Sequence, residues 1–405
     1  MQKNLFTYMA SSPSTGLNDG LLGDISIAIQ PNMSVRGWPI QAGSRALEGF
    51  TAIYDATVIE RLKQAGATLK GSICMSEFGF GLAGDTGAMV LNTGDVDTVL
   101  ITDTLGEARM AACMAGVIGF KPSYGMVSRF GLVGLVPSME CFGIVAKHLD
   151  DIAKVMSVVV GNDSRDLSMP EFGAGIELPD FRQVFETDKP IRTCGIIKEC
   201  LEILEKDEFR AFDAAISRLV KSGLQVREAR LEDFDLARIV HNVLGSVEAS
   251  SSAGKYDGVR YGHRTTAAKN WNEMYMNSRA ESFGLLVKNY LFQGAYFQYE
   301  NYDAFMDAAR IRTRLLEGTE AALEGLDVLM LPTRHRAFDP FSACTVNTIY
   351  DVFSCTLLSN ITGHPAITLP GMVTLDDGDL GLQLMGSRFQ DARLLSTAAR
   401  LIDLS

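Results

Sequence analysis

The chain has 405 residues, of which 47% are hydrophobic and 21% are charged, a composition typical of a folded globular protein and not of a disordered or fibrous one. It carries 37 Lys and Arg residues against 49 Asp and Glu residues, so its formal net charge is −12. An acidic chain without a basic patch repels the phosphates of nucleic acid, and we therefore expect no direct nucleic-acid partner.

The cysteines and the apolar segments indicate the compartment. Seven cysteines are scattered without a C-x-x-C pair, which is typical of reduced thiols. Residues 1–20 are too polar for a secretory signal, and no apolar stretch reaches the ~18 residues that a membrane span needs. We therefore expect a cytoplasmic protein without membrane contact.

The first third of the chain predicts strands and helices in alternation. Residues 24–29 alternate between polar and apolar side chains as a strand does, and residues 54–64 carry apolar side chains at helical spacing. Short apolar runs follow at 67–73, 98–101 and 116–120, separated by glycine-rich loops. Buried strands between crossover connections have this pattern, so a mixed α/β architecture is predicted.

The rest of the chain continues the same class. A predicted helix at 150–160 is followed by a polar linker at 161–179, and residues 180–325 read as an inserted portion of βα units and helices. The elements predicted after the linker are a strand at 191–197, a helix at 208–221, a strand at 224–229, a helix-rich stretch at 232–325 and strands at 327–331 and 366–369.

No motif for a metal or an organic cofactor is present. The five histidines are dispersed and lack the spacing of metal ligands. The sequence has no phosphate-binding loop, and Gly79-Phe80-Gly81 lacks the further glycine of a dinucleotide fingerprint. We therefore expect neither a metal nor a cofactor.

Residues 103–129 carry the most informative pattern, in which glycine turns and small side chains lead into the sequence GFKPSYG. Here the chain resembles the amidase signature family, in particular the A subunits of tRNA-dependent amidotransferases. Further matches follow the same order: GDISIAIQPN at 23–32, KYDGVRYGHR at 255–264 and NITGHPAITLPG at 360–371. The resemblance implies one domain over residues 1–405 with a central, twisted, mixed sheet and helices on both faces. It also implies that the N-terminal helical segment common in the family is missing.

The resemblance also locates the catalytic positions. Members of the family hydrolyse amides with a Ser-Ser-Lys triad, because a serine hydroxyl attacks only after a base takes its proton. The matching positions here are Gln30 for the lysine, Ala83 for the bridging serine and Glu107 for the nucleophile. An amide, a methyl group and a carboxylate cannot relay a proton to a hydroxyl. The standard mechanism is therefore expected to be lost.

The family's oxyanion-binding turn corresponds to Thr104, Leu105 and Gly106, where leucine replaces a glycine. We expect the carboxylate of Glu107, at a helix start, either to fill the oxyanion site or to pair with Arg109 in a collapsed pocket. The family residues that hold a glutamine substrate, which correspond to positions near 289–290 and 353, are not recovered.

These observations favour a catalytically degenerate amidase-fold protein that acts as a structural or regulatory partner. Its expected partner is a protein, either amidotransferase-like subunits or a second copy of itself. Two alternatives stay open. One is an active amidase or other hydrolase with a rebuilt site, using Glu107 with Lys121 or Cys113. The other is a small-molecule binding protein whose emptied pocket holds a ligand.

Overall fold

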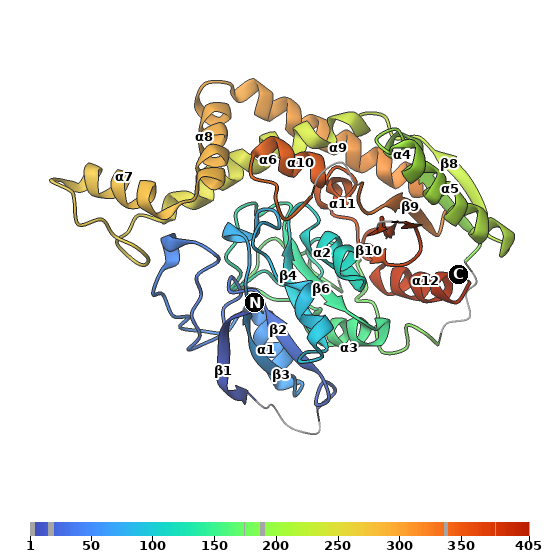
Figure 1. Ribbon diagram of the computed structural model, residues 1–405, viewed down its shortest axis with the longest axis horizontal. Coiled ribbons are helices and arrows are strands. Elements are labelled where there is room, and N and C mark those ends of the chain that lie inside the picture. The colour runs from blue at the N-terminus through green and yellow to red at the C-terminus, as the bar shows by residue number, and fades with distance from the viewer. Residues whose placement is uncertain are drawn as a thin grey trace.

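The computed structural model describes residues 5–14, 20–173, 175–186, 191–335, 339–376 and 378–404. At its centre lies a mixed sheet of eleven strands in the order β1-β3-β2-β4-β6-β5-β10-β13-β9-β7-β8, with helices on both faces (Figure 1). The predicted α/β class and the central mixed sheet are thereby confirmed.

The first half of the chain builds one side of the sheet. Strand β2 lies parallel to both β3 and β4, and β4 lies antiparallel to β6. The strands of this half are β1 (Phe6–Ser14), β2 (Ser26–Ile29), β3 (Thr68–Ile73), β4 (Thr98–Asp103), β5 (Ile118–Lys121) and β6 (Cys141–Ala146). Its helices are α1 (Thr57–Gln64), α2 (Glu107–Ala115) and α3 (Leu149–Val159).

The second half completes the sheet and adds most of the helices. Its strands are β7 (Thr193–Ile197), β8 (Gln225–Ala229), β9 (Val328–Pro332), β10 (Ala366–Leu369) and β13 (Leu382–Met385), with a separate pair formed by β11 (Thr374–Leu375) and β12 (Gly378–Asp379). Its helices are α4 (Lys198–Leu201), α5 (Lys206–Lys221), α6 (Ala237–Ser252), α7 (Trp271–Ser282), α8 (Leu285–Tyr299), α9 (Tyr302–Leu323), α10 (Val346–Val352), α11 (Leu357–Thr362) and α12 (Asp391–Leu404).

The sheet separates two apolar cores. Along β4, Val99 and Ile101 belong to the core that contains α2, α6, α8 and α9, whereas Leu100 belongs to the core that contains α1, α3, α5 and α12. Successive residues of a strand point to opposite faces, so a strand covered on both faces is apolar throughout. This explains the continuous apolar run that begins at residue 98.

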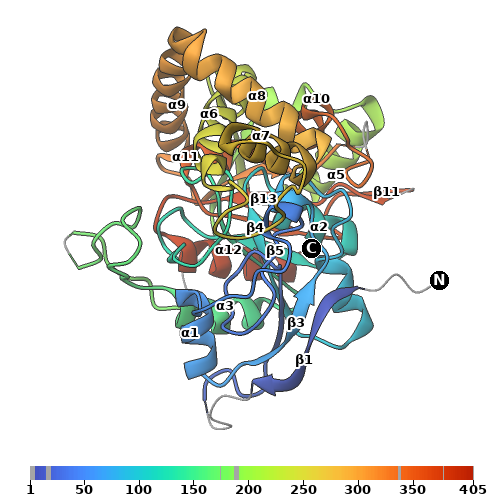
Figure 2. The same ribbon diagram turned by 90° about the vertical axis from the view of Figure 1, so that its left-hand side faces the viewer.

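Residues 180–325 contribute β7 and β8 to the edge of the central sheet and supply α4 to α9. Helix α6 packs against both α8 and α9, and these helices form a layer over one face of the sheet (Figure 2). Helix α7 projects from this layer, away from the body of the molecule (Figure 1). Within the described ranges, no helix has the length and apolar character to cross a membrane.

Close packing of α2 on the sheet depends on small residues. A Cβ at Gly143 in β6 would lie 2.3 Å from the Cβ of Ala108 in α2. Gly106, which caps α2, has a φ of 128°, and a Cβ there would lie 2.2 Å from Oγ1 of Thr356. Both positions therefore require glycine, and the tight contact fixes the turn that precedes α2.

Candidate functional site

The turn between β4 and α2 holds a buried carboxylate. Glu107 is the first residue of α2 and is 1% exposed. Its Oε2 accepts hydrogen bonds from the backbone N–H groups of Thr104 at 2.7 Å, Leu105 at 2.8 Å and Gly106 at 3.2 Å. Its Oε1 accepts a fourth from the N–H of Gly81 at 3.2 Å. One side chain thus accepts four backbone N–H groups at this turn.

Opposing effects set the charge of this carboxyl group. Burial and the nearby charge of Asp103 raise the pKa of Glu107, whereas hydrogen bonds from the backbone N–H groups of Leu105 and Thr104 lower it by favouring the anion. Burial dominates, and the pKa is about 8. The group offers hydrogen-bond acceptors to these N–H groups and has no alcohol hydroxyl that could act as a serine does. Because its oxygens fill the backbone donors, these donors are not free to stabilise the oxyanion of an amide undergoing attack.

Gln30 follows β2 and is likewise buried. Its Oε1 accepts a hydrogen bond from the backbone N–H of Thr102 at 2.8 Å, and its Nε2 donates one to Oδ2 of Asp85 at 2.6 Å. Asp85 also accepts the N–H of Gly87 at 2.6 Å, and burial raises the pKa of its carboxyl to about 7. Gln30 therefore links β2 and β4 to the loop that carries Asp85.

Sequence reasoning did not single out Asp85. Ala83, the position matched to the bridging serine, is exposed on a turn, and the partner of Gln30 lies two residues further along. The available signal was an acidic residue within a loop of glycine and apolar residues. Such a residue is either exposed or paired when buried, and only the three-dimensional structure distinguishes the two cases.

The expected pairing of Glu107 with Arg109 is wrong, because Arg109 pairs with Asp103. Nη2 of Arg109 lies 2.9 Å from Oδ1 of Asp103, and both side chains are fully buried. Arg109 also donates to the backbone carbonyl of Thr356 at 3.0 Å and to the side chain of Asn360 at 2.5 Å. Burial alone would raise the pKa of the Asp103 carboxyl. The charge and hydrogen bonds of Arg109 outweigh burial and hold this pKa below its usual range. The two acidic residues thus have separate partners.

Aromatic side chains fill the space beside Glu107. The rings of Phe80 and Tyr290 stack with their centroids 4.4 Å apart, and the hydroxyls of Tyr290 and Tyr350 lie 2.9 Å apart. Nδ1 of His241 lies 2.8 Å from the hydroxyl of Tyr350, and its Nε2 donates to the carbonyl of Thr104 at 2.9 Å. All of these side chains are buried, and burial lowers the pKa of His241 to about 4, which keeps the ring neutral.

The two residues considered for a rebuilt site have other contacts. Nζ of Lys121 donates to the carbonyl of Pro122 at 3.0 Å, and Sγ of Cys113 lies 3.6 Å from the carbonyl of Asp379. Burial raises the pKa of the Cys113 thiol, which disfavours the nucleophilic thiolate. Among the residues that the structure describes, no group of three His, Cys, Asp or Glu side chains has the arrangement of a metal site.

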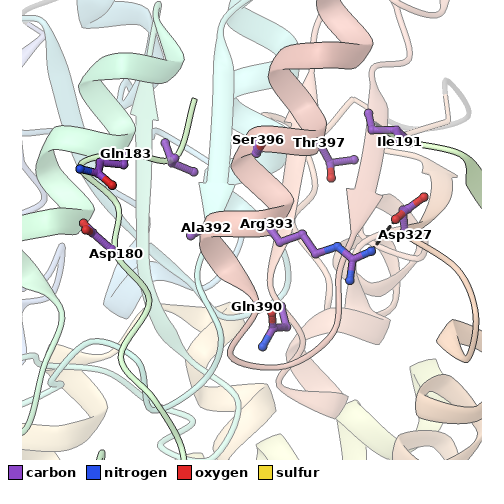
Figure 3. A pocket seen from close by; sticks show the side chains of 10 residues that line it. Asp180, Gln183, Ile191, Asp327, Gln390, Ala392, Arg393, Ser396 and Thr397 are labelled. Carbon is purple, nitrogen blue, oxygen red and sulfur yellow. Dashed lines mark hydrogen bonds and ion pairs between the residues drawn. The ribbon is translucent and has the colours of Figure 1, made fainter. Parts of the chain in front are cut away.

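An open pocket of about 490 Å³ lies elsewhere, along α12 (Figure 3). Arg393 reaches across it to Oδ1 of Asp327 at 2.5 Å, and Asp327 also accepts the backbone N–H groups of Arg192 and Thr193. This pocket shares no lining residue with the site around Glu107. Its ion pair ties α12 to the start of β7 and of β9.

Comparison with known proteins shows the family of the chain. The sequence model of the family described as Amidase matches residues 8–93 and 87–395. The chain is 32% identical over 412 residues to the glutamyl-tRNA(Gln) amidotransferase A subunit of Natronomonas pharaonis, covering 95% of this chain and 96% of that protein. It is 31% identical to the protein of the same name from Haloarcula marismortui, covering 97% and 98%.

Solved structures share the fold. The glutamyl-tRNA(Gln) amidotransferase A subunit of Thermotoga maritima superposes with a TM-score of 0.77 at 23% identity, covering 97% of this chain and 85% of that one. A structure described as a vestigial protein complex, which bears on the origins of an s-triazine catabolic enzyme, superposes with a TM-score of 0.79 at 20% identity, covering 99% and 91%.

Proposed function

Since the chain belongs to the amidase family, we propose that it is a member without Ser-Ser-Lys amide hydrolysis, which acts as a structural or regulatory partner of other proteins. Gln30, Ala83 and Glu107 stand, in this proposal, at the positions of the lysine, the bridging serine and the nucleophilic serine. The turn Thr104-Leu105-Gly106 stands at the position of the oxyanion hole.

One observation carries the proposal: the Glu107 carboxylate accepts the N–H groups of Thr104, Leu105, Gly106 and Gly81. Amide hydrolysis by this family's chemistry needs a hydroxyl, a base that takes its proton and free donors for the oxyanion. A carboxyl group in this place supplies no alcohol hydroxyl and occupies these four donors. The amide of Gln30, which donates to Asp85, has no capacity to accept a proton from a hydroxyl.

The surroundings favour this function over ligand binding. Phe80, Tyr290 and Tyr350 are buried against one another beside Glu107, where a small molecule would need space. A protein partner is supported by the relatives, which are named as subunits of an amidotransferase, and by a similar structure described as a protein complex.

The test is ammonia release by the purified chain from a panel of primary amides, including glutamine, asparagine and short peptide amides. We expect no release above the blank, and none from Glu107→Gln, which keeps the shape of the side chain and an acceptor for the buried N–H groups. Turnover in the native chain that Glu107→Gln abolishes while the variant stays folded would establish a rebuilt active site and overturn the proposal.

A gain-of-function variant extends this test. It combines Gln30→Lys, Ala83→Ser and Glu107→Ser with Asp85→Asn, because a lysine beside the Asp85 carboxylate would keep its proton and could not act as a base. Activity in this variant and none in the native chain would support the proposed loss at these positions. The matched control keeps Gln30 and carries the other three changes.

A further inference from the structure

Helix α8 is apolar on two opposite faces. One face, which includes Tyr290 and Gly294, is buried against α6. The other face carries four large apolar side chains that are exposed: Leu285 at 74%, Phe292 at 75%, Tyr296 at 52% and Tyr299 at 76%. A helix that is apolar all round is normally covered all round, so the outer face of α8 calls for a second surface.

The spacing of the exposed side chains indicates what kind of surface fits. The exposed positions of α8 are Leu285, Asn289, Phe292, Tyr296 and Tyr299, which we call the α8 stripe. Their intervals of four, three, four and three residues give the 3.5-residue period of a seam between two packed helices. At 1.5 Å per residue, the stripe is about 21 Å long. A stripe with this spacing and length is a surface that a second α-helix packed alongside α8 would cover.

A groove borders the stripe on the side of α7. It has a volume of about 460 Å³ and lies between α7 and the N-terminal half of α8, with Tyr275, Met276, Arg279 and Phe292 among its lining residues. Met276 is 67% exposed. The lining residues come from α7, α8 and the link between them, together with Ser250 of α6. Helix α7 runs outward from the start of α8, so both helices lie at the surface of the molecule (Figure 1).

We infer that the occupant of this surface is a second copy of the chain, with the two α8 helices packed antiparallel about a two-fold axis at Phe292. In this register Leu285 faces Tyr299 of the second copy, and Asn289 lies next to its Tyr296. All five positions of the stripe are then covered by the same five positions of the partner. A two-fold interface requires this kind of self-complementarity.

Charge supports the antiparallel direction. Lys288 lies beside the stripe in the N-terminal half of α8, and the exposed acidic residues Glu300 and Asp303 lie beyond its C-terminal end. In the antiparallel register, Glu300 of the second copy comes within about one helical turn, roughly 6 Å along the axis, of Lys288. A parallel arrangement would place like charges together instead.

The groove between α7 and α8 adds interface area that one face of α8 does not provide. A stable interface buries about 800 Å² on each partner, which is more than a single 15-residue helix face provides. In the proposed register Tyr296 of the second copy lies opposite Lys288, which lines the groove, so its ring enters the groove beside Met276. This inference concerns assembly and holds whether or not the chain hydrolyses amides.

The experiment is sedimentation velocity of the full chain from low to high micromolar concentration. We expect a dimer that Phe292→Glu converts to a monomer, because the substitution puts two carboxylates on the two-fold axis. Leu167→Glu, at a side chain that is 96% exposed on a distant loop, is the matched control and should leave the dimer intact. Circular dichroism and thermal unfolding establish that each variant is folded.

A charge exchange distinguishes a second copy from any other occupant. Lys288→Glu and Glu300→Lys should each weaken the dimer when studied alone, whereas an equimolar mixture of the two variants should restore it, since both inter-copy pairs become attractive. A native chain that is monomeric at high micromolar concentration would overturn the inference. A dimer that Phe292→Glu does not affect would overturn it as well.

Discussion

The buried carboxyl of Glu107 makes stability depend on pH. Burial raises its pKa from 4.5 to about 8. A group with a raised pKa holds its proton more tightly in the folded state than in the unfolded state. Its contribution to stability is therefore fully present below about pH 4.5 and is lost as the pH rises through about 8. At 1.36 kcal/mol per pKa unit, this shift corresponds to about 5 kcal/mol.

The variant Glu107→Gln isolates this contribution, because it keeps the shape of the side chain and removes its titration. Chemical unfolding of both proteins between about pH 5 and pH 8 should show the native chain losing stability relative to the variant by several kcal/mol. Burial raises the pKa of Asp85 to about 7, so Asp85 also titrates in this range. It does so in both proteins, and its contribution therefore cancels in the difference between their stabilities. Glu202→Gln, at an exposed position, serves as the control.

A constant difference in stability between the two proteins across this pH range would refute the reasoning. It would mean that the four backbone N–H groups outweigh burial and that Glu107 is an anion throughout. The experiment therefore decides which of the two opposing effects sets the charge of the site.

Three further predictions follow from the same region. Gly106→Ala should destabilise the chain by roughly 3 kcal/mol or more in thermal unfolding, because the φ of Gly106 is 128° and the new Cβ would meet Thr356. The control is Gly254→Ala, which should be nearly neutral because the space around Gly254 is open. Arg109→Met should lower the free energy of unfolding by about 3–5 kcal/mol, because it leaves the buried Asp103 carboxylate without its cation. Adding Asp103→Leu should recover part of this loss in chemical unfolding. If the double variant recovers nothing, the assigned pair is contradicted. Glutamine, asparagine and simple amides should not raise the melting temperature, whereas a concentration-dependent rise would indicate a ligand-binding pocket.

Much of the fold was predictable because local patterns agree with it. The apolar run from residue 98 predicted β4, and the amphipathic spacing at 208–221 predicted α5 to within two residues. Strand β1 was not predicted, since it is formed by antiparallel pairing with β3, some sixty residues away in the sequence. That pairing depends on contacts that no local pattern records.

The candidate site was likewise predictable only where local sequence motifs carry it. Gln30 and Glu107 stand inside motifs that the sequence displays, and so do Thr104, Leu105 and Gly106, whose N–H groups Glu107 accepts as expected. Asp85, the partner of Gln30, does not stand inside such a motif. Asp103 lies six residues and Glu107 two residues before Arg109, and sequence separation alone does not identify the partner of Arg109. The choice is made by the turn before α2, where the N–H groups converge on Glu107 and leave Asp103 to the guanidinium.

Under the proposed function, that choice also gives a reason for a carboxyl group at this position. The N–H groups of Thr104, Leu105, Gly106 and Gly81 are buried, and a buried donor without a partner costs about 1–3 kcal/mol. Loss of the side chain at position 107 would thus be far more costly than its replacement by an acceptor. Under the proposed function, Glu107 joins the 81–87 loop to α2, and the former catalytic turn has become part of the core.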